Sequence, residues 1–344
     1  MENTKRMENY KMNGFKIIII GVGGIGQAWV SIVKSSKEWH IAGLVEQRKD
    51  IVRKIANEYG IPLNNIFTDY KTAIRKLDAD AVLIATPPET HKELILESFH
   101  AGLHVLCEKP LAINMIEAEK LRRESKKFNL KLMINQNYRW WWFIQSIKKY
   151  LDKGMIGKIS YLNYEFHKCS HFGGWREKLE DILLEDMAIH HFDLMRYLTG
   201  KDCLEVYANS FKPRWSWFNG NPCASVLLKF EDGIYVNYFG SWVARGKESS
   251  WHGDIRIVGE KGTIYLGSDN RPVAILTNKT GIYQLEKVKM HYSDLKYTLH
   301  EFRSSILEDR LPEINIEDNI KTLTISWAAI KSSKDGKPVV TLRK

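Results

Sequence analysis

A mostly apolar run, Phe15–Ile20, leads directly into the glycine-rich segment Gly21–Gly26. Such a run is typical of a strand covered on both faces of a sheet. The segment fits G-x-G-x-x-G, in which the first glycine permits a tight turn, the second a close backbone approach, and the third close packing of the following helix. Because the helix N-terminus then offers free N–H groups and partial positive charge, the pattern indicates a site for the pyrophosphate of a dinucleotide.

An acidic residue stands where such a site needs one. Glu46 ends the next predicted strand, His40–Glu46, twenty residues after Gly26. A carboxylate there accepts hydrogen bonds from the adenosine ribose and repels a 2′-phosphate, so NAD is predicted rather than NADP, although Arg48 could soften that preference. The residues of these two segments predicted to contact the cofactor are Gly21, Gly23, Gly24, Ile25, Gly26, Glu46 and Gln47.

Strand-like and helix-like patterns alternate through the first part of the chain, residues 1–137. Further strands are expected at Ala81–Ala85, His104–Cys107 and Lys131–Ile134, and helices at Ile51–Tyr59, Lys71–Leu77, His91–Ala101 and Met115–Phe128. This alternation predicts an α/β Rossmann domain with a doubly wound parallel sheet.

From residue 138 to residue 344 the strands mostly follow one another without intervening helices. They are expected at Ile159–His167, Glu205–Phe211, Ala224–Phe230, Ile234–Ser241 and Asp254–Val258, with helices at Ile144–Lys153, Leu184–Leu198, Leu295–Glu308 and Ile316–Ser332. The pattern predicts an α+β domain with a large, mostly antiparallel open sheet. Since open sheets of this kind usually bury one face against another subunit, a homodimer or homotetramer through this sheet is expected.

Three segments carry candidate chemistry. Thr86-Pro87-Pro88, with His91, and Glu108-Lys109-Pro110 each follow a predicted strand, at the carboxyl edge where ligands of such sheets bind. Asp186 and His190 stand at i and i+4, on one face of a predicted helix.

At these residues the chain resembles the glucose–fructose oxidoreductase, inositol dehydrogenase and MocA family. The likeness covers nearly the whole chain, including the glycine loop, residues 101–111, Asp186-x-x-x-His190-x-x-Asp193 and residues 196–200. It implies an oxidoreductase that uses a nicotinamide cofactor on a secondary hydroxyl or carbonyl of a sugar, inositol or glycoside. It also implies a cis bond before Pro110. The family's glycine within the Asp-x-Gly-x-His motif is Ala188 here, so the start of that helix is expected to differ in shape.

The resemblance implies a catalytic group of Lys109, Asp186 and His190. Hydride transfer from an alcohol needs a base of near-neutral pKa for the hydroxyl proton, which suits His190, with Asp186 orienting its ring. Lys109 can stabilise the developing alkoxide. Further cofactor contacts are expected from Thr86, Pro87, His91, Glu108, Lys109, Trp175 and Arg176, and substrate contacts from Lys109, Tyr138, Arg139, His167, His171, Trp175, Asp186 and His190.

Other polar residues of the same helix are interpreted as structural. His191 is expected to be a satisfied core or surface residue, and Asp193 to form a hydrogen bond or ion pair with Arg196 or Arg122.

Two other functions share these features. A glycoside-cleaving enzyme would oxidise its substrate only transiently and return the hydride, so it would release no free NADH. A catalytically silent NAD-binding sensor would need none of Lys109, Asp186 and His190, and their joint presence argues against it.

Charge and composition exclude other classes. The net charge is +10, but basic and acidic residues are interspersed over the whole length, so no nucleic-acid surface is predicted. No apolar stretch approaches the roughly 20 residues of a membrane helix, and residues 1–14 do not resemble a signal peptide. A cytoplasmic protein without a metal site is therefore expected.

Overall fold

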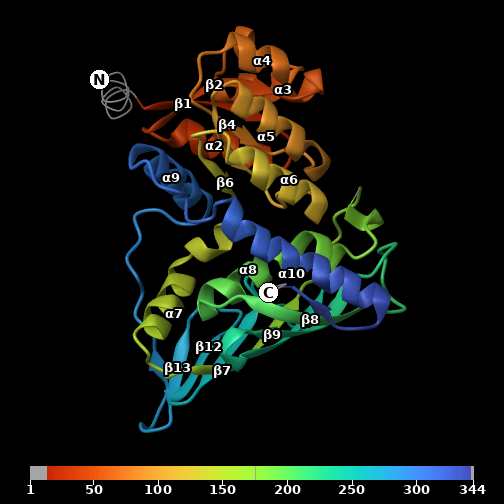
Figure 1. Cartoon of the computed structure of the whole chain (residues 1–344), viewed down its shortest axis with the longest axis vertical. Coiled ribbons are helices and arrows are strands. Elements are labelled where there is room, and N and C mark those ends of the chain that lie inside the picture. Colours follow the sequence, from red (N-terminus) through yellow and green to blue (C-terminus); the bar gives the residue numbers. More distant parts are fainter. Residues whose placement is uncertain (1–13, 175, 342–344) are drawn as a thin grey trace. The chain divides into compact units, whose positions relative to one another are not determined.

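The computed structural model describes residues 14–174 and 176–341, which divide into two compact units (Figure 1). One unit takes in the chain up to Asn137 together with Tyr292–Ile320, and the other takes in Tyr138–His291 together with the chain from Lys321 onward. The sequence pattern assigns everything after residue 137 to one domain, so the grouping of Tyr292–Ile320 with the first unit departs from that expectation.

The first unit contains a six-stranded sheet in the order β3-β2-β1-β4-β5-β6, and all five strand pairs are parallel. This is the strand order of a doubly wound dinucleotide-binding fold, so the predicted fold class is confirmed for this unit. Only the two-residue strand β3 is absent from the sequence pattern. The strands are β1 (Phe15–Ile20), β2 (Trp39–Val45), β3 (Ile66–Phe67), β4 (Ala81–Ile84), β5 (His104–Cys107) and β6 (Leu132–Ile134).

Helices cover this sheet, and their ends follow local rules. The Asp69 carboxylate accepts a hydrogen bond from the Thr72 N–H and caps α4, while Asn114 caps α6 in the same way. Gly60 ends α3 in the left-handed conformation. The helices are α2 (Ile25–Ser35), α3 (Lys49–Tyr59), α4 (Tyr70–Lys76), α5 (His91–His100), α6 (Met115–Ser125) and α9 (Asp294–Leu307).

Helix α9 explains why a late segment belongs to the first unit. Leu295, Leu299, Phe302 and Ile306 form its apolar face and are buried in the core around β1, β2 and α2. The Phe302 ring stacks on Trp39 of β2, with centroids 5.7 Å apart. The helical period predicts a helix at Leu295–Glu308, but it does not state which core its apolar face will join.

The second unit is built on a nine-stranded sheet in the order β14-β13-β12-β11-β7-β10-β9-β8-β15. Its pairs are antiparallel apart from β7 with β10, which confirms the predicted, mostly antiparallel sheet. The short outer strands β12 to β15 are absent from the sequence pattern. The strands are β7 (Ile159–His167), β8 (Cys203–Phe211), β9 (Cys223–Phe230), β10 (Tyr235–Ser241), β11 (Asp254–Gly259), β12 (Gly262–Leu266), β13 (Val273–Leu276), β14 (Tyr283–Gln284) and β15 (Val339–Val340).

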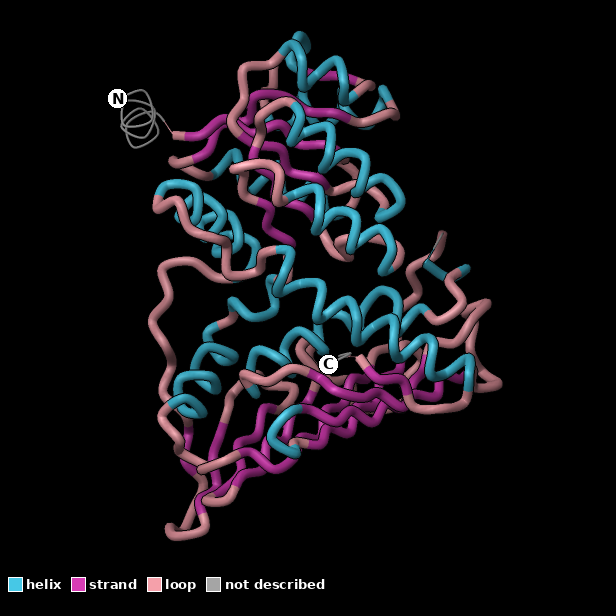
Figure 2. Tube along the Cα trace, viewed as in Figure 1, coloured by secondary structure: helices cyan, strands magenta, loops and turns pink. Residues whose placement is uncertain are grey.

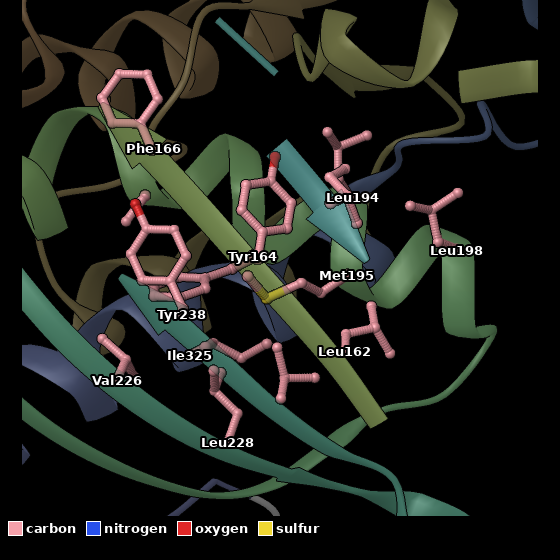
Figure 3. Packing of buried hydrophobic residues seen from close by; sticks show 14 of the residues in the cluster. Leu162, Tyr164, Phe166, Leu194, Met195, Leu198, Val226, Leu228, Tyr238 and Ile325 are labelled. Carbon is pink, nitrogen blue, oxygen red and sulfur yellow. The ribbon is translucent and has the colours of Figure 1, made fainter. Parts of the chain in front are cut away.

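The long helices of this unit cover one face of the sheet and leave the other open (Figure 2). They are α7 (Trp142–Asp152), α8 (Ala188–Thr199) and α10 (Ile316–Asp335), whose first residues belong to the other unit. Leu162, Tyr164 and Phe166 alternate along β7 toward the covered face, where Leu194 and Met195 of α8 join the same core (Figure 3). A π-helical turn, Leu183–Met187, precedes α8.

His191 of α8 is fully buried in this core. Its Nδ1 lies 3.0 Å from the Tyr238 hydroxyl, and its Nε2 lies 3.1 Å from the carbonyl of Trp251. A carbonyl only accepts hydrogen bonds, so this pairing suits a neutral ring that donates from Nε2. Burial lowers the pKa of His191 to about 3. The expectation of a satisfied core histidine therefore agrees with the structure.

Replacing His191 by phenylalanine should flatten the acid dependence of stability. The pKa of His191 is about 3 in the folded protein but about 6.5 when unfolded, so between these values the unfolded chain binds one more proton. Stability is then lost as pH falls from 6.5 toward 3. Below pH 6, the urea unfolding free energy of the wild type should fall more steeply than that of His191→Phe, by about 1.4 kcal/mol per pH unit. Equal slopes would contradict this assignment.

Candidate functional site

The glycine loop of the first unit has no space for side chains at two positions. Gly21 has φ +85°, and a Cβ there would lie 2.7 Å from the Ala85 carbonyl oxygen. A Cβ on Gly26 would lie 2.0 Å from the carbonyl oxygen of Gly21, so this glycine permits the contact between α2 and the end of β1. Gly24, at the N-cap of α2, provides no side chain to cap the first N–H groups, and the first turn contains no acidic residue. Gly23 and the exposed Ile25 also lie between Gly21 and Gly26. These features fit the pyrophosphate of a dinucleotide.

Glu46 follows β2 at the same edge of the sheet. Its Oε1 accepts hydrogen bonds from the backbone N–H and the Nε of Arg48, at 3.2 and 3.1 Å. Burial alone would raise the pKa of Glu46, but the bonds from Arg48 outweigh it and hold the pKa below its ordinary value. Glu46 is thus a carboxylate at neutral pH, with an arginine beside it. Gln47, the next residue, is exposed.

His91 is an exception among the predicted cofactor residues, because its side chain is fully buried. Its Nδ1 lies 2.8 Å from the Pro110 carbonyl oxygen and its Nε2 lies 2.9 Å from that of Thr86. Burial lowers its pKa. His91 therefore holds together the segments that follow β4 and β5 instead of facing a ligand. Pro87, which directly follows Thr86, is exposed.

Glu108 also differs from the expected cofactor contact, because it is only 7% exposed. Its Oε1 accepts hydrogen bonds from Trp29 Nε1 at 2.7 Å and Asn135 Nδ2 at 2.9 Å. Burial raises its pKa. Lys109, which follows it, is half-buried, and the Lys109–Pro110 peptide bond is cis, as the resemblance implies.

In the second unit, the candidate residues lie around the start of α8. Asp186 lies in the π-helical turn, and its Oδ2 accepts a hydrogen bond from Arg176 Nε at 3.1 Å. The expectation, drawn from Ala188, that this helix start differs in shape from that of the family stays a prediction. The ring of His190 stacks on that of Tyr138, with centroids 4.4 Å apart and planes 10° from parallel. Trp175 lies outside the described residues.

Two predicted substrate residues lie elsewhere in this unit. The Nε and Nη2 of Arg139 each donate to one oxygen of the Asp193 carboxylate at 2.6 Å, and both side chains are buried. Arg139 is therefore part of a core ion pair, and it is the partner of Asp193 that the sequence pattern did not predict. Arg196 bonds to Asp202 and to the hydroxyl of Thr322, which itself donates to the Asp193 carboxylate.

His167 is the second of these residues. It points to the open face of the sheet, because it alternates with Phe166, which packs against His191 on the helix-covered face. It is therefore on the wrong side of the sheet to accompany His190. His171 is exposed and stacks on Trp217, with ring centroids 3.7 Å apart, and its predicted contact with substrate stays a prediction.

Two residues that contact the site were not predicted. The sequence pattern identifies Trp29 only as an apolar position on the helix after the glycine loop. Asn135 follows a strand, as Glu46 and Lys109 do, so its position at the carboxyl edge was a usable signal. Within residues 14–174 and 176–341, no three His, Cys, Asp or Glu side chains gather where they could hold a metal ion. No helix of that same part is long and apolar enough to cross a membrane.

Comparison with known proteins finds relatives along nearly the whole chain. A myo-inositol 2-dehydrogenase of Thermotoga maritima is 25% identical over 334 residues, covering 94% of this chain and 98% of its own. A D-apiose dehydrogenase of Rhizobium rhizogenes is 24% identical over 344 residues, covering 95% and 98%.

Solved structures share the fold. An oxidoreductase of Agrobacterium radiobacter, solved with NAD+, L-tartaric acid and magnesium, superposes with a TM-score of 0.87 at 22% identity, over 95% of this chain and 98% of that one. A levoglucosan dehydrogenase in complex with NADH superposes with a TM-score of 0.83 at 20% identity, over 96% of this chain and 100% of that one.

Two family models match consecutive parts of the chain. Residues 15–136 match the oxidoreductase family with an NAD-binding Rossmann fold, and residues 144–265 match the C-terminal domain of the same family. With the glycine loop, the strand order and the open second sheet described above, the chain belongs to the glucose–fructose oxidoreductase, inositol dehydrogenase and MocA family of NAD-binding oxidoreductases.

Proposed function

We propose that this protein is an NAD-dependent dehydrogenase acting on a secondary hydroxyl or carbonyl of a sugar, inositol or glycoside. The observation that carries the proposal is the presence, in a chain of this family, of Lys109 just after β5 and of His190 at the start of α8, four residues after Asp186, which accepts a hydrogen bond from Arg176. The sugar and inositol dehydrogenases among its relatives support the same substrate class.

Each residue has a defined role in this reaction. Bound nicotinamide supplies the hydride acceptor or donor. His190 takes the hydroxyl proton as the alcohol is oxidised, a role for which imidazole has a suitable intrinsic pKa. Lys109 donates a hydrogen bond to the reacting oxygen and stabilises its developing negative charge. Asp186, held by Arg176, favours the imidazolium that forms, and Tyr138 supports the His190 ring from one side.

Removing either proton-handling group should abolish most of the activity. A screen of inositols, monosaccharides and aryl glycosides for NADH formation identifies the substrate. Lys109→Ala and His190→Ala should then each lower kcat by about 100-fold or more, because general acid–base and electrostatic groups contribute factors of this size. Lys120→Ala and His40→Ala, at exposed positions, are the matched controls. Activity within tenfold of wild type in either test variant would refute its role.

The same screen distinguishes oxidation from transient oxidation. A dehydrogenase accumulates free NADH in proportion to oxidised product, whereas an enzyme that cleaves a glycoside and returns the hydride releases the aglycone without NADH.

The environment of Glu46 supports a preference for NAD. The ionised carboxylate would accept hydrogen bonds from the adenosine ribose and repel a 2′-phosphate. Arg48, which now bonds to Glu46, would be released toward such a phosphate if the carboxylate were neutralised.

The variant Glu46→Gln should therefore lose cofactor discrimination. The ratio of kcat/KM for NAD to that for NADP should fall by about tenfold or more, since a charge repulsion is removed and Arg48 is freed. Glu58→Gln, which makes the same change at an exposed position of α3, is the control. A ratio that falls equally in both variants, or in neither, would contradict the role of Glu46.

The open face of the second sheet supports self-association. Tyr161 of β7 pairs with Tyr235 of β10, and Tyr207 of β8 pairs with Leu227 of β9, and these side chains are 38 to 55% exposed. These side chains lie on adjacent strands, interspersed with polar ones, and tyrosine is enriched at protein–protein interfaces. We therefore propose that two or four copies of the chain associate through this face.

A charge placed in this face should break the assembly. Leu227→Glu should shift the species measured by sedimentation velocity to the monomer, because a desolvated carboxylate without a partner is costly. Leu63→Glu, at an exposed leucine of the first unit, should leave the assembly intact. A wild type that sediments as a monomer would refute the proposed association.

A further inference from the structure

The residues on both sides of Lys109 are hydrogen-bonded to the surrounding chain; Glu108 is buried, and Lys109 and Pro110 are half-buried. On one side, Glu108 receives N–H groups from Trp29 and Asn135 on Oε1, and its Oε2 lies 3.3 Å from the backbone N–H of Lys109. On the other side, the Pro110 carbonyl lies against His91. The backbone around Lys109 is therefore held by the buried side chains of Trp29, Asn135 and His91.

Trp29 connects this arrangement to the glycine loop. It lies on α2, which begins at Ile25 directly after that loop, and its side chain is fully buried. Its indole N–H donates to Glu108 at 2.7 Å, so the helix with its N-terminus at the pyrophosphate site is bonded to the residue preceding Lys109.

Asn135 completes the support from the opposite direction. Its backbone N–H donates to the Cys107 carbonyl at 2.8 Å, and its Oδ1 accepts a hydrogen bond from Thr298 of α9 at 3.1 Å. Glu108 is thus held by α2 and by the end of β6. An isolated buried carboxyl would be unfavourable, but charge-assisted donors on both oxygens offset that cost.

From this geometry we infer that Trp29 and Glu108 are positioning residues, which fix the Lys109 peptide relative to the glycine loop so that its amine meets the reacting oxygen. The part of this inference that concerns the reaction rests on the proposed function of Lys109. The restraint on the Lys109 segment is independent of that proposed function.

The test uses a pair of matched tryptophan variants of the full chain. Trp29→Phe keeps an aromatic ring in the core and removes the donor to Glu108. Trp39→Phe makes the same change at another buried tryptophan of the first unit, whose Nε1 has no hydrogen-bond partner among the residues that the structure describes. Any general loss of packing should appear in both variants, and the loss of the hydrogen bond only in Trp29→Phe.

The first readout is amide hydrogen exchange and needs no substrate. In Trp29→Phe the peptide that spans residues 107–113 should exchange at least about fivefold faster than in wild type, and in Trp39→Phe it should not. Equal exchange in the two variants would overturn the inference whether or not the enzyme turns over.

The second readout is kinetic. Trp29→Phe should lower kcat by about tenfold while the dissociation constant of NADH changes by less than about threefold, since small displacements of a catalytic group cost this much or more. In a Lys109→Ala background the same substitution should have no further effect, because its influence passes through the lysine. An additive loss would show a merely structural role.

A third variant tests the carboxylate itself. In Glu108→Gln, the amide oxygen can still accept hydrogen bonds from Trp29 and Asn135. The amide NH₂ group then points at the Lys109 N–H, so two hydrogen-bond donors face each other. The variant should reproduce the exchange and kcat effects of Trp29→Phe. If exchange is faster in Trp29→Phe than in Trp39→Phe but the wild type reduces NAD with none of the polyols screened, the proposed function is refuted and the restraint stands. Turnover that is equal in Trp29→Phe and Trp39→Phe would refute the positioning role alone.

Discussion

Because all of its strand pairs are parallel, the first sheet has the carboxyl end of every strand at the same edge. Consecutive strands therefore deliver residues to one edge even though they are far apart in the sequence. Gly21, Glu46, Thr86, Glu108 and Asn135 each follow a strand of the six-stranded sheet directly or by one residue. The features discussed for the first unit, from the glycine loop to the support of Lys109, depend on this constraint.

The two adjacent histidines of α8 show how rotation about one helix separates roles. Each residue turns the helix by about 100°, so neighbours face different surroundings. His190 stacks on Tyr138, whereas His191 enters the core, where burial keeps its ring neutral and it contacts Tyr238 and Trp251. One helix thus provides both a candidate base and a core residue, and the direction in which each side chain leaves the helix decides between them.

Much of the fold and part of the site could be predicted from the sequence, for identifiable reasons. The strands of the first sheet are buried on both faces and read as apolar runs, and the glycine loop has sterically required spacing. Partners distant in sequence could not be predicted. The pairing of Arg139 with Asp193 depends on packing, and the alternation in β7 separates His167 from Phe166 without showing which face α8 covers. Likewise, burial of His91 and Glu108 follows from neighbours that no local pattern reveals.

The return of α9 to the first unit makes that unit discontinuous along the chain, which crosses the boundary after Asn137, after His291 and after Ile320. A fragment ending at residue 137 would leave the ring of Trp39 without Phe302 and the Asn135 amide without Thr298. During synthesis the nucleotide-binding half therefore cannot be completed until almost the entire polypeptide has emerged, and its folding is tied to that of the inserted half.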